Sequence, residues 1–302
     1  MLIPLLLILA GLIVAALMVY AVWLAHNMTV QERVPVSDHP ARLGLKWEDV
    51  TFPSRGDEIP LSGWYLPGAA DDRCIILVQG TDHHRNSPGI RALQLGGDLV
   101  DRGFNVLLFD LRARGESGGG RSSEGDREQW DVFGAIDYVA GRGIPIERIG
   151  LLGFSLGAGV SILVAAQEPR IPAIVSDSGF LDYMMEFQKL SVGPFPLPKW
   201  YTHCIVWIGR LFFQSDVSRV RPAQVVQDVE QPIFFIHGED DPLISAEETV
   251  ELHVISNNRE DRVWIVPGAE HINVYRKMPE VYARRVSQFF HRHMIGAGGD
   301  GD

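Results

Sequence analysis

The first 31 residues contain no lysine, arginine, aspartate or glutamate. All 27 basic and 38 acidic residues therefore lie in the other 271 residues (302 minus 31), where they leave a net charge of −11. This shortage of basic residues argues against a nucleic acid partner. With 46% hydrophobic and 22% charged residues, the chain can bury a full core, which excludes disorder as its main state.

Cysteine is equally scarce. The sequence has two, Cys74 and Cys204, which are too few and too far apart for a disulfide framework. Cysteine content therefore does not indicate whether the protein lies in an oxidising or a reducing compartment. His83 and His84 lack a third partner at metal spacing, so we expect no metal ion and no cofactor. We interpret these two histidines as polar residues at the rim or on the substrate side of a site.

Residues 1–25 form an uninterrupted apolar run. As a helix the run would span roughly 37 Å, more than the ~30 Å hydrocarbon core of a bilayer, and it predicts a single transmembrane anchor. A buried soluble helix would need a core on all sides. A cleaved signal peptide is the main alternative, but the run exceeds the usual apolar region, lacks a charged start, and has no clean small-residue cleavage site before His26.

The residues at the end of this segment and after it bear on how it would sit in a membrane. Tyr20 and Trp23 are placed for an aromatic interface belt. The basic residues that follow favour a cytoplasmic location for the rest of the chain, but acidic residues are interleaved with them. We therefore expect a single-pass membrane protein and leave the side of its main domain undecided.

Beyond a polar linker at 26–45, residues 46–294 read as one α/β domain. Residues 47–53 and 59–67 flank a turn and predict a hairpin. Short apolar runs then alternate with helical patterns, which predicts a mostly parallel sheet with helices on both faces. The expected strands are 74–79, 105–110, 148–153, 173–176, 232–237 and 262–266, and the expected helices are 89–101, 127–140, 156–167, 246–256 and 281–294.

One segment interrupts this alternation. Residues 180–220 are rich in aromatic residues without strand periodicity, and they predict a partly helical cap; an ordinary helical excursion that fills the core is the other interpretation. The glycine-rich tail at 295–302 is expected to be disordered.

The pattern G-x-S-x-G occurs twice, around Ser117 and around Ser155. A nucleophile elbow needs a strand before the serine and a helix after it, because that turn lifts the hydroxyl above the sheet. Ser155 has both, since 148–153 reads as a strand and 156–166 as a helix of small residues. Ser117 lies in a flexible, glycine-rich stretch, and we interpret it as a loop residue. Ser155 is therefore the candidate nucleophile.

A serine hydroxyl needs an imidazole base and usually a carboxylate that orients the base. His271 follows the last predicted strand, from which its ring can reach the elbow; a surface loop histidine is the other interpretation. For the carboxylate we choose Asp241, which follows the predicted strand 232–237, and keep Asp177, after the predicted strand 173–176, as the alternative. Glu239 and Asp240 read as solvated loop charges. The order Ser155, Asp241, His271 is that of α/β-hydrolases.

Further motifs support this order. The stretches His237-Gly238 with Asp241, Pro267–His271, and Asp110-Leu-Arg-Ala-Arg-Gly-Glu-Ser117 accompany the elbow. Over about 47–293 the chain resembles α/β-hydrolases of the serine aminopeptidase-like branch, which includes single-pass membrane-anchored α/β-hydrolase-domain proteins. The resemblance implies that the second serine is a loop element after the fourth strand.

The resemblance also locates an oxyanion hole. One donor should be the backbone amide of Leu156 at the helix N-terminus, and the other that of Thr81, in a loop where the family usually carries His-Gly. Here Gln79-Gly80 stands in that place. The sequence also lacks the HGGG loop of some lipases.

We therefore expect a membrane-anchored serine hydrolase that cleaves carboxylic esters or thioesters. Its substrate would be a small acyl or lipid-like molecule. A serine at the elbow disfavours the dehalogenase and epoxide hydrolase branches, for which the resemblance would imply aspartate. Two alternatives stay open, a serine peptidase of the aminopeptidase-like type and a non-catalytic membrane-tethered binding module, because fold does not determine substrate.

Overall fold

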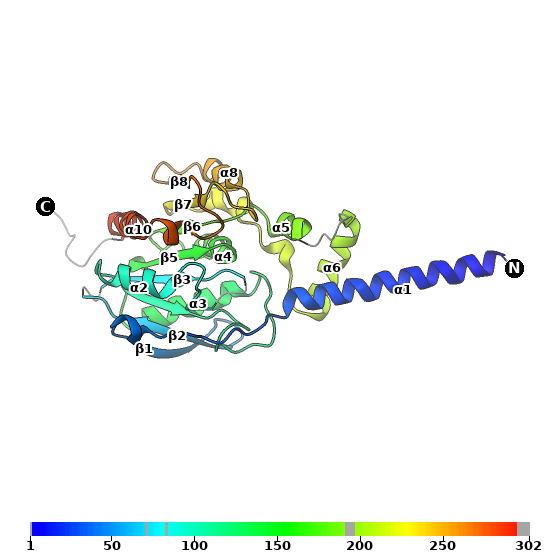
Figure 1. Ribbon diagram of the computed structural model, residues 1–302, viewed down its shortest axis with the longest axis horizontal. Coiled ribbons are helices and arrows are strands. Elements are labelled where there is room, and N and C mark those ends of the chain that lie inside the picture. Colours follow the sequence, from blue (N-terminus) through cyan, green and yellow to red (C-terminus); the bar gives the residue numbers. More distant parts are fainter. Residues whose placement is uncertain (1, 70–71, 82–83, 191–196, 295–302) are drawn as a thin grey trace.

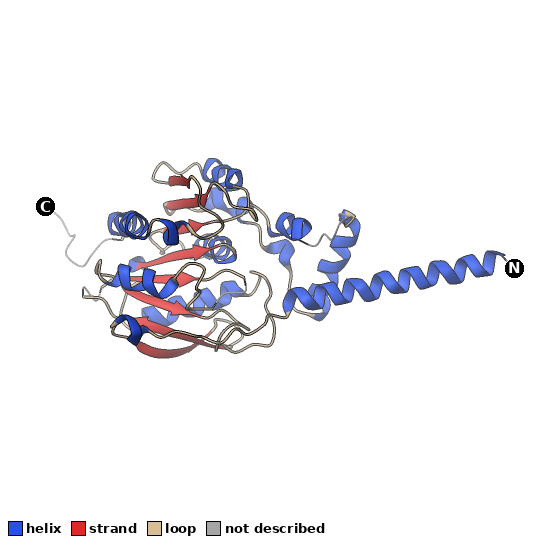
Figure 2. Ribbon diagram, viewed as in Figure 1, coloured by secondary structure: helices blue, strands red, loops and turns tan. Residues whose placement is uncertain are grey.

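A mixed sheet of eight strands forms the centre of the protein (Figures 1 and 2). The computed structural model describes residues 2–69, 72–81, 84–190 and 197–294. The strand order is β1-β2-β4-β3-β5-β6-β7-β8. The strands are β1 (Glu48–Pro53), β2 (Pro60–Leu66), β3 (Cys74–Val78), β4 (Asn105–Phe109), β5 (Ile149–Phe154), β6 (Ile174–Asp177), β7 (Ile233–Gly238) and β8 (Arg262–Val266).

The direction of the strands follows the predicted pattern. β1 and β2 form an antiparallel hairpin, and β2 also pairs antiparallel with β4. All pairs from β4 through β3, β5, β6 and β7 to β8 are parallel. Parallel strands end at one edge of the sheet, so the loops that follow β3, β5 and β7 lie close together there.

Helices cover both faces of the sheet (Figure 2). Side chains alternate along β3: Cys74, Ile76 and Val78 pack into one core, with α3 (Glu128–Gly141) and α4 (Leu156–Ala165), whereas Ile75 and Leu77 pack into the other. The second core includes α2 (Ala92–Val100), α9 (Val274–Lys277) and α10 (Pro279–His293), while α8 (Ala246–Ser256) contributes Leu252 to the first. The predicted fold class is confirmed.

Two further helices, α5 (Tyr183–Leu190) and α6 (Lys199–Phe212), lie outside these layers. They fall within the stretch predicted as a cap, and that role stays a prediction. Short helical turns complete the fold: η1 (Pro40–Leu43), η2 (Ile146–Arg148), η3 (Val217–Arg219), α7 (Pro222–Val225) and η4 (Val226–Asp228). The predicted disordered tail, 295–302, lies outside the described residues.

The N-terminal helix α1 (Leu2–Thr29) projects from the sheet domain (Figure 1). It is the one helix in the described part of the chain that is long and apolar enough to cross a membrane. The helix runs four residues beyond the apolar segment, and its last turns pack against α6. The residues that follow are held to the domain: the guanidinium of Arg33 donates to the carbonyls of Ser117 (2.6 Å) and Gly119 (2.7 Å).

Candidate active site

Ser155 lies in the sharp turn between β5 and α4. Its backbone has φ +52° and ψ −117°, a conformation that L-residues rarely adopt and that turns the side chain out of the sheet. The two glycines of the motif have a packing reason. A Cβ on Gly153 would lie 2.3 Å from the carbonyl oxygen of Gly157, and one on Gly157 would lie 2.1 Å from that of Val78. The pattern G-x-S-x-G is thus a condition for packing α4 against β3 and β5.

Replacement of Gly157 by alanine is expected to lower the free energy of unfolding by about 1–3 kcal/mol, because backbone atoms of β3 and α4 must separate. The control is Gly141→Ala in α3, where a Cβ meets nothing within 4 Å. It should leave stability unchanged or raise it by up to about 1 kcal/mol. Chemical unfolding of the full chain in detergent measures both variants. Equal stabilities would contradict the packing argument.

The structure brings Ser155, His271 and Asp241 together. His271 Nε2 lies 2.9 Å from Ser155 Oγ, and His271 Nδ1 lies 2.6 Å from Asp241 Oδ2. His271 belongs to the loop after β8, and Asp241 to the loop after β7. The Asp241 side chain is fully buried, and that of His271 is 14% exposed. A continuous line of hydrogen bonds therefore runs from carboxylate to hydroxyl.

The Asp241 carboxylate accepts four hydrogen bonds, one of them from His271. Its Oδ1 accepts the backbone amides of Leu243 (2.8 Å) and Ile244 (3.0 Å), and its Oδ2 also lies 3.0 Å from His237 Nε2. That nitrogen lies 3.0 Å from the Ile244 carbonyl as well, so it must carry a proton. Burial opposes the ionised carboxyl, but the bonds from His237 and His271 prevail and hold the pKa of Asp241 well below its usual value.

The other candidates have different partners. Asp177 accepts from the Tyr282 hydroxyl (2.8 Å) and the Ser178 hydroxyl (3.0 Å), and burial raises its pKa to about 6 against those bonds. Ser117 is buried in its loop: its Oγ donates to the Asp110 carbonyl (2.5 Å) and accepts the Ser62 amide. The Asp177 carbonyl accepts the Ser155 amide (2.9 Å), but the side chains of Asp177 and Ser117 bond elsewhere and do not join Ser155, His271 and Asp241.

The remaining polar candidates lie elsewhere. Glu239 and Asp240 are exposed, as expected for loop charges. His84 is buried, and its Nδ1 accepts the Asn86 amide. His83 lies outside the described residues, and in the part of the chain that is described no group of three potential metal ligands comes together.

The amides expected to form the oxyanion hole belong to Thr81, after β3, and Leu156, at the start of α4. Within the described residues, neither amide donates a backbone hydrogen bond. Gln79, which replaces the histidine typical of the resembled family, is buried, and its amide nitrogen and oxygen have no hydrogen-bond partner in the described structure.

Comparison with known proteins adds to this geometry. The family model described as X-Pro dipeptidyl-peptidase (S15 family) matches residues 55–219, more than half of the chain. The chain belongs to the S15 family. The match covers β2 through α6, and therefore the elbow, but it ends before Asp241 and His271. The predicted resemblance to α/β-hydrolases is confirmed.

Relatives of this S15-family chain include YqkD of Bacillus subtilis, 27% identical over 63% of each chain, so the match spans under two thirds of that relative. YfhR of Salmonella typhimurium is 28% identical over 76% of this chain and 75% of its own. A solved structure, the Pyrococcus furiosus esterase Pf2001, superposes with a TM-score of 0.72 at 26% identity, covering 88% of this chain and all of that one. The S15-family chain thus has the fold of esterase- and peptidase-type hydrolases.

Sequence reasoning missed Glu124. This carboxylate is buried in the loop before α3, where it accepts from the Tyr183 hydroxyl (2.6 Å) and the Gln31 amide (2.8 Å) and lies 3.4 Å from Thr81 Oγ1. Burial raises the pKa of Glu124, although Arg114 opposes the rise. One carboxyl thus joins α5, the segment after α1 and the Thr81 loop. A lone acid in a glycine- and serine-rich loop gives no signal of such a role.

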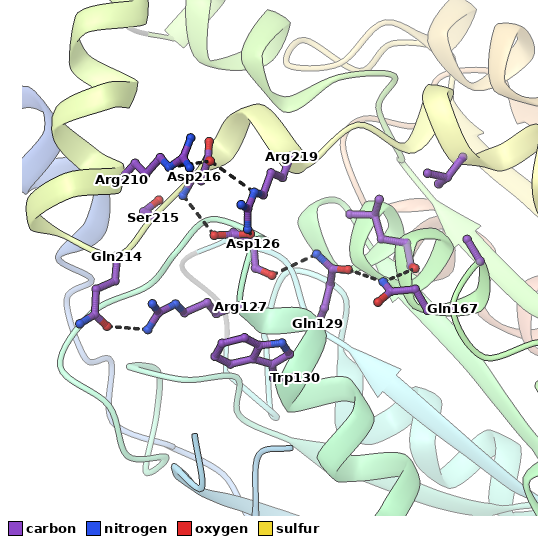
Figure 3. Close-up of a pocket in the computed structure, with 13 residues that line it drawn as sticks. Asp126, Arg127, Gln129, Trp130, Gln167, Arg210, Gln214, Ser215, Asp216 and Arg219 are labelled. Carbon is purple, nitrogen blue, oxygen red and sulfur yellow. Dashed lines mark hydrogen bonds and ion pairs between the residues drawn. The ribbon is translucent and has the colours of Figure 1, made fainter. Parts of the chain in front are cut away.

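The S15-family chain also has a cavity of about 590 Å³ beside α3, lined in part by charged side chains (Figure 3). Asp126 and Asp216 approach Arg219 there, and Arg127 donates to Gln214. Its lining includes none of Ser155, Asp241 and His271. Because its charged groups largely pair with one another, we assign it no part in the site.

Proposed function

We propose that the protein is a serine hydrolase in which Ser155 is the nucleophile, His271 the general base and Asp241 the carboxylate that orients the base. The observation that carries the proposal is the unbroken line of hydrogen bonds from Asp241 Oδ2 through both ring nitrogens of His271 to Ser155 Oγ. When Nδ1–H donates to Asp241, the neutral ring carries its proton on Nδ1. Nε2 is then unprotonated and faces the Ser155 hydroxyl, as a general base must.

The reaction has two halves. Ser155 Oγ bonds to the substrate carbonyl carbon while its proton moves to His271 Nε2; the carbon–leaving group bond then breaks, and the leaving group takes that proton. Water next bonds to the acyl carbon and gives a proton to the same nitrogen, and Ser155 regains it as the acid departs. The amides of Leu156 and Thr81 would stabilise the oxyanion, each lowering the barrier by about 2.7–4 kcal/mol.

The proposed bond class is a carboxylic ester or thioester with an acyl or lipid-like group. The 26% identity with the Pyrococcus furiosus esterase supports ester hydrolysis. The proposed single-pass anchor α1, apolar from Leu2 to Ala25, would hold the site beside a lipid surface. The S15 family description favours the second candidate, a serine peptidase.

A substrate panel distinguishes these candidates. We expect the full chain in detergent to hydrolyse p-nitrophenyl octanoate and longer esters at least about tenfold more efficiently than the acetate, because apolar acyl groups gain roughly 0.8 kcal/mol per buried methylene. Activity on an Xaa-Pro p-nitroanilide in place of the esters would favour the peptidase. A strong preference for acetate would contradict the lipid-like substrate.

A non-catalytic membrane-tethered module is a different class of function. Its test is covalent labelling of the folded wild-type chain by a fluorophosphonate, which reacts with an activated serine. We expect labelling, and its absence from a folded chain would contradict the enzyme proposal.

A further inference from the structure

Helix α6 has two apolar faces. One face is buried and contains Tyr201, Ile205 and Ile208. A second face, about 100° around the helix, exposes a stripe at helical spacing, Trp200, Cys204, Trp207 and Leu211, in which both tryptophans are 61% exposed and Leu211 is 57% exposed. Soluble proteins seldom leave two tryptophans so open on one helix, which marks this face as an interaction surface.

The buried face of α6 packs on the proposed membrane anchor. Ala21, Ala25 and Thr29, four residues apart on α1, are the buried positions of that helix, and the two alanines cluster with Ile205 and Ile208. Small residues at this spacing let two helices approach closely. The Tyr201 hydroxyl also donates to the Leu17 carbonyl (2.6 Å). These contacts fix α6 along the C-terminal half of α1 (Figure 1).

The position of α6 along α1 determines how deep α6 would lie in the membrane. Tyr20 and Trp23 stack with ring centroids 5.7 Å apart, and they mark where the proposed anchor leaves the hydrocarbon core, because such side chains gather at the membrane interface. The contacts with α6 and with Phe213, the residue that follows it, run from Leu17 to His26; the His26 and Phe213 ring centroids lie 5.7 Å apart. This stretch covers roughly 14 Å on both sides of the expected boundary.

The composition of α6 suits that boundary. Its ionisable side chains, apart from tyrosine and cysteine, are Lys199, His203 and Arg210, and it contains no acidic residue. Helices that lie in the plane of a lipid interface combine tryptophan and leucine on one side with basic residues. Because the buried face of α6 packs on the proposed anchor, the exposed stripe is held beside the bilayer, which favours lipid over a protein partner.

We propose that α6 lies in the lipid interface of the leaflet next to the hydrolase domain, with the stripe from Trp200 to Leu211 in contact with acyl chains and headgroups. The inference rests on the proposed membrane-spanning role of α1. It adds a second contact between enzyme and bilayer, and α5, which shares the apolar cluster with α6, connects that contact through Tyr183 to Glu124 and the Thr81 loop.

Cys204 provides the test, because it lies on the stripe and the other cysteine, Cys74, is buried. The full chain is labelled at Cys204 with the fluorophore NBD and reconstituted in phosphatidylcholine vesicles. The control is Cys204→Ala with Val254→Cys, an exposed apolar position on α8. We expect doxyl-labelled lipids to quench the Cys204 probe at least about twofold more than the Val254 probe, with a blue-shifted emission.

A third label, Cys204→Ala with Leu12→Cys in α1, separates the two proposals. Quenching at Leu12 but not at Cys204 would overturn the placement of α6 and leave the anchor intact. No quenching at either position would mean that the anchor itself fails. A blue-shifted Cys204 probe without lipid quenching would indicate burial against a second copy or another protein, and would also overturn the proposal.

Discussion

Replacement of Ser155 by alanine is expected to abolish fluorophosphonate labelling and to lower kcat for ester hydrolysis by about 10⁴–10⁶-fold. The hydroxyl lies 2.9 Å from His271 Nε2 in a backbone conformation that serves to present it. Without Oγ, no acyl-enzyme can form, and what remains is the smaller effect of substrate binding and the oxyanion donors. Gel labelling and steady-state kinetics on the full chain measure the two losses.

The sequence carries its own control for this experiment. Ser117 stands in the second G-x-S-x-G pattern, so Ser117→Ala makes the same change in the same local motif. Its hydroxyl bonds to backbone groups of Asp110 and Ser62, and its loss should cost about 1–3 kcal/mol of stability. Labelling per folded molecule should stay at the wild-type level. Loss of labelling in Ser117→Ala with retention in Ser155→Ala would refute the assignment.

The difference between these two serines could be predicted because each motif depends on its neighbours in the chain. A strand before Ser155 and a helix of small residues after it are local patterns, and the close approach at Gly153 and Gly157 gives the physical reason for them. The fold class was predictable on the same grounds, since strands buried on both faces appear as short apolar runs between helical patterns.

The contacts between distant segments were not predictable in this way. Glu124, for example, accepts from Gln31 and Tyr183, which lie 93 and 59 residues away in the chain, and no local pattern encodes those contacts. Likewise, Ala21 and Ala25 read as ordinary members of an apolar run. Their packing against α6 depends on how two segments about 180 residues apart (205 minus 25) meet in space.

Asp241→Asn is expected to lower kcat by about 10⁴-fold while the fold is kept. An asparagine can still accept the amides of Leu243 and Ile244 through its oxygen, but it then presents an NH₂ group to His271 Nδ1. That nitrogen would have to accept, so the proton would move to Nε2. Directed at Ser155, a protonated Nε2 cannot take the proton of the hydroxyl.

His237, the second histidine in contact with Asp241, gives a further reason to expect a defect in Asp241→Asn. His237 Nε2 must keep its proton because it faces the Ile244 carbonyl, so the asparagine NH₂ would meet a second donor at 3.0 Å. We therefore expect a loss of stability as well, of about 1–3 kcal/mol. This loss of stability should be largest near neutral pH. Because the pKa of Asp241 is lower in the folded than in the unfolded chain, its carboxylate stabilises the fold above the unfolded-state pKa. This stabilisation is lost as the pH falls through the folded-state pKa.

Asp240→Asn is the matched control for this variant, because it makes the same change one residue away on an exposed side chain. It should keep kcat within about twofold and leave stability within about 0.5 kcal/mol at every pH. Steady-state kinetics at neutral pH and unfolding between pH 2 and pH 8 compare the two, since the contribution of the Asp241 carboxylate is lost only below the unfolded-state pKa of about 4. If both variants lost activity equally, the loop as a whole would matter, and the orientation of His271 by the Asp241 carboxylate would not explain the loss.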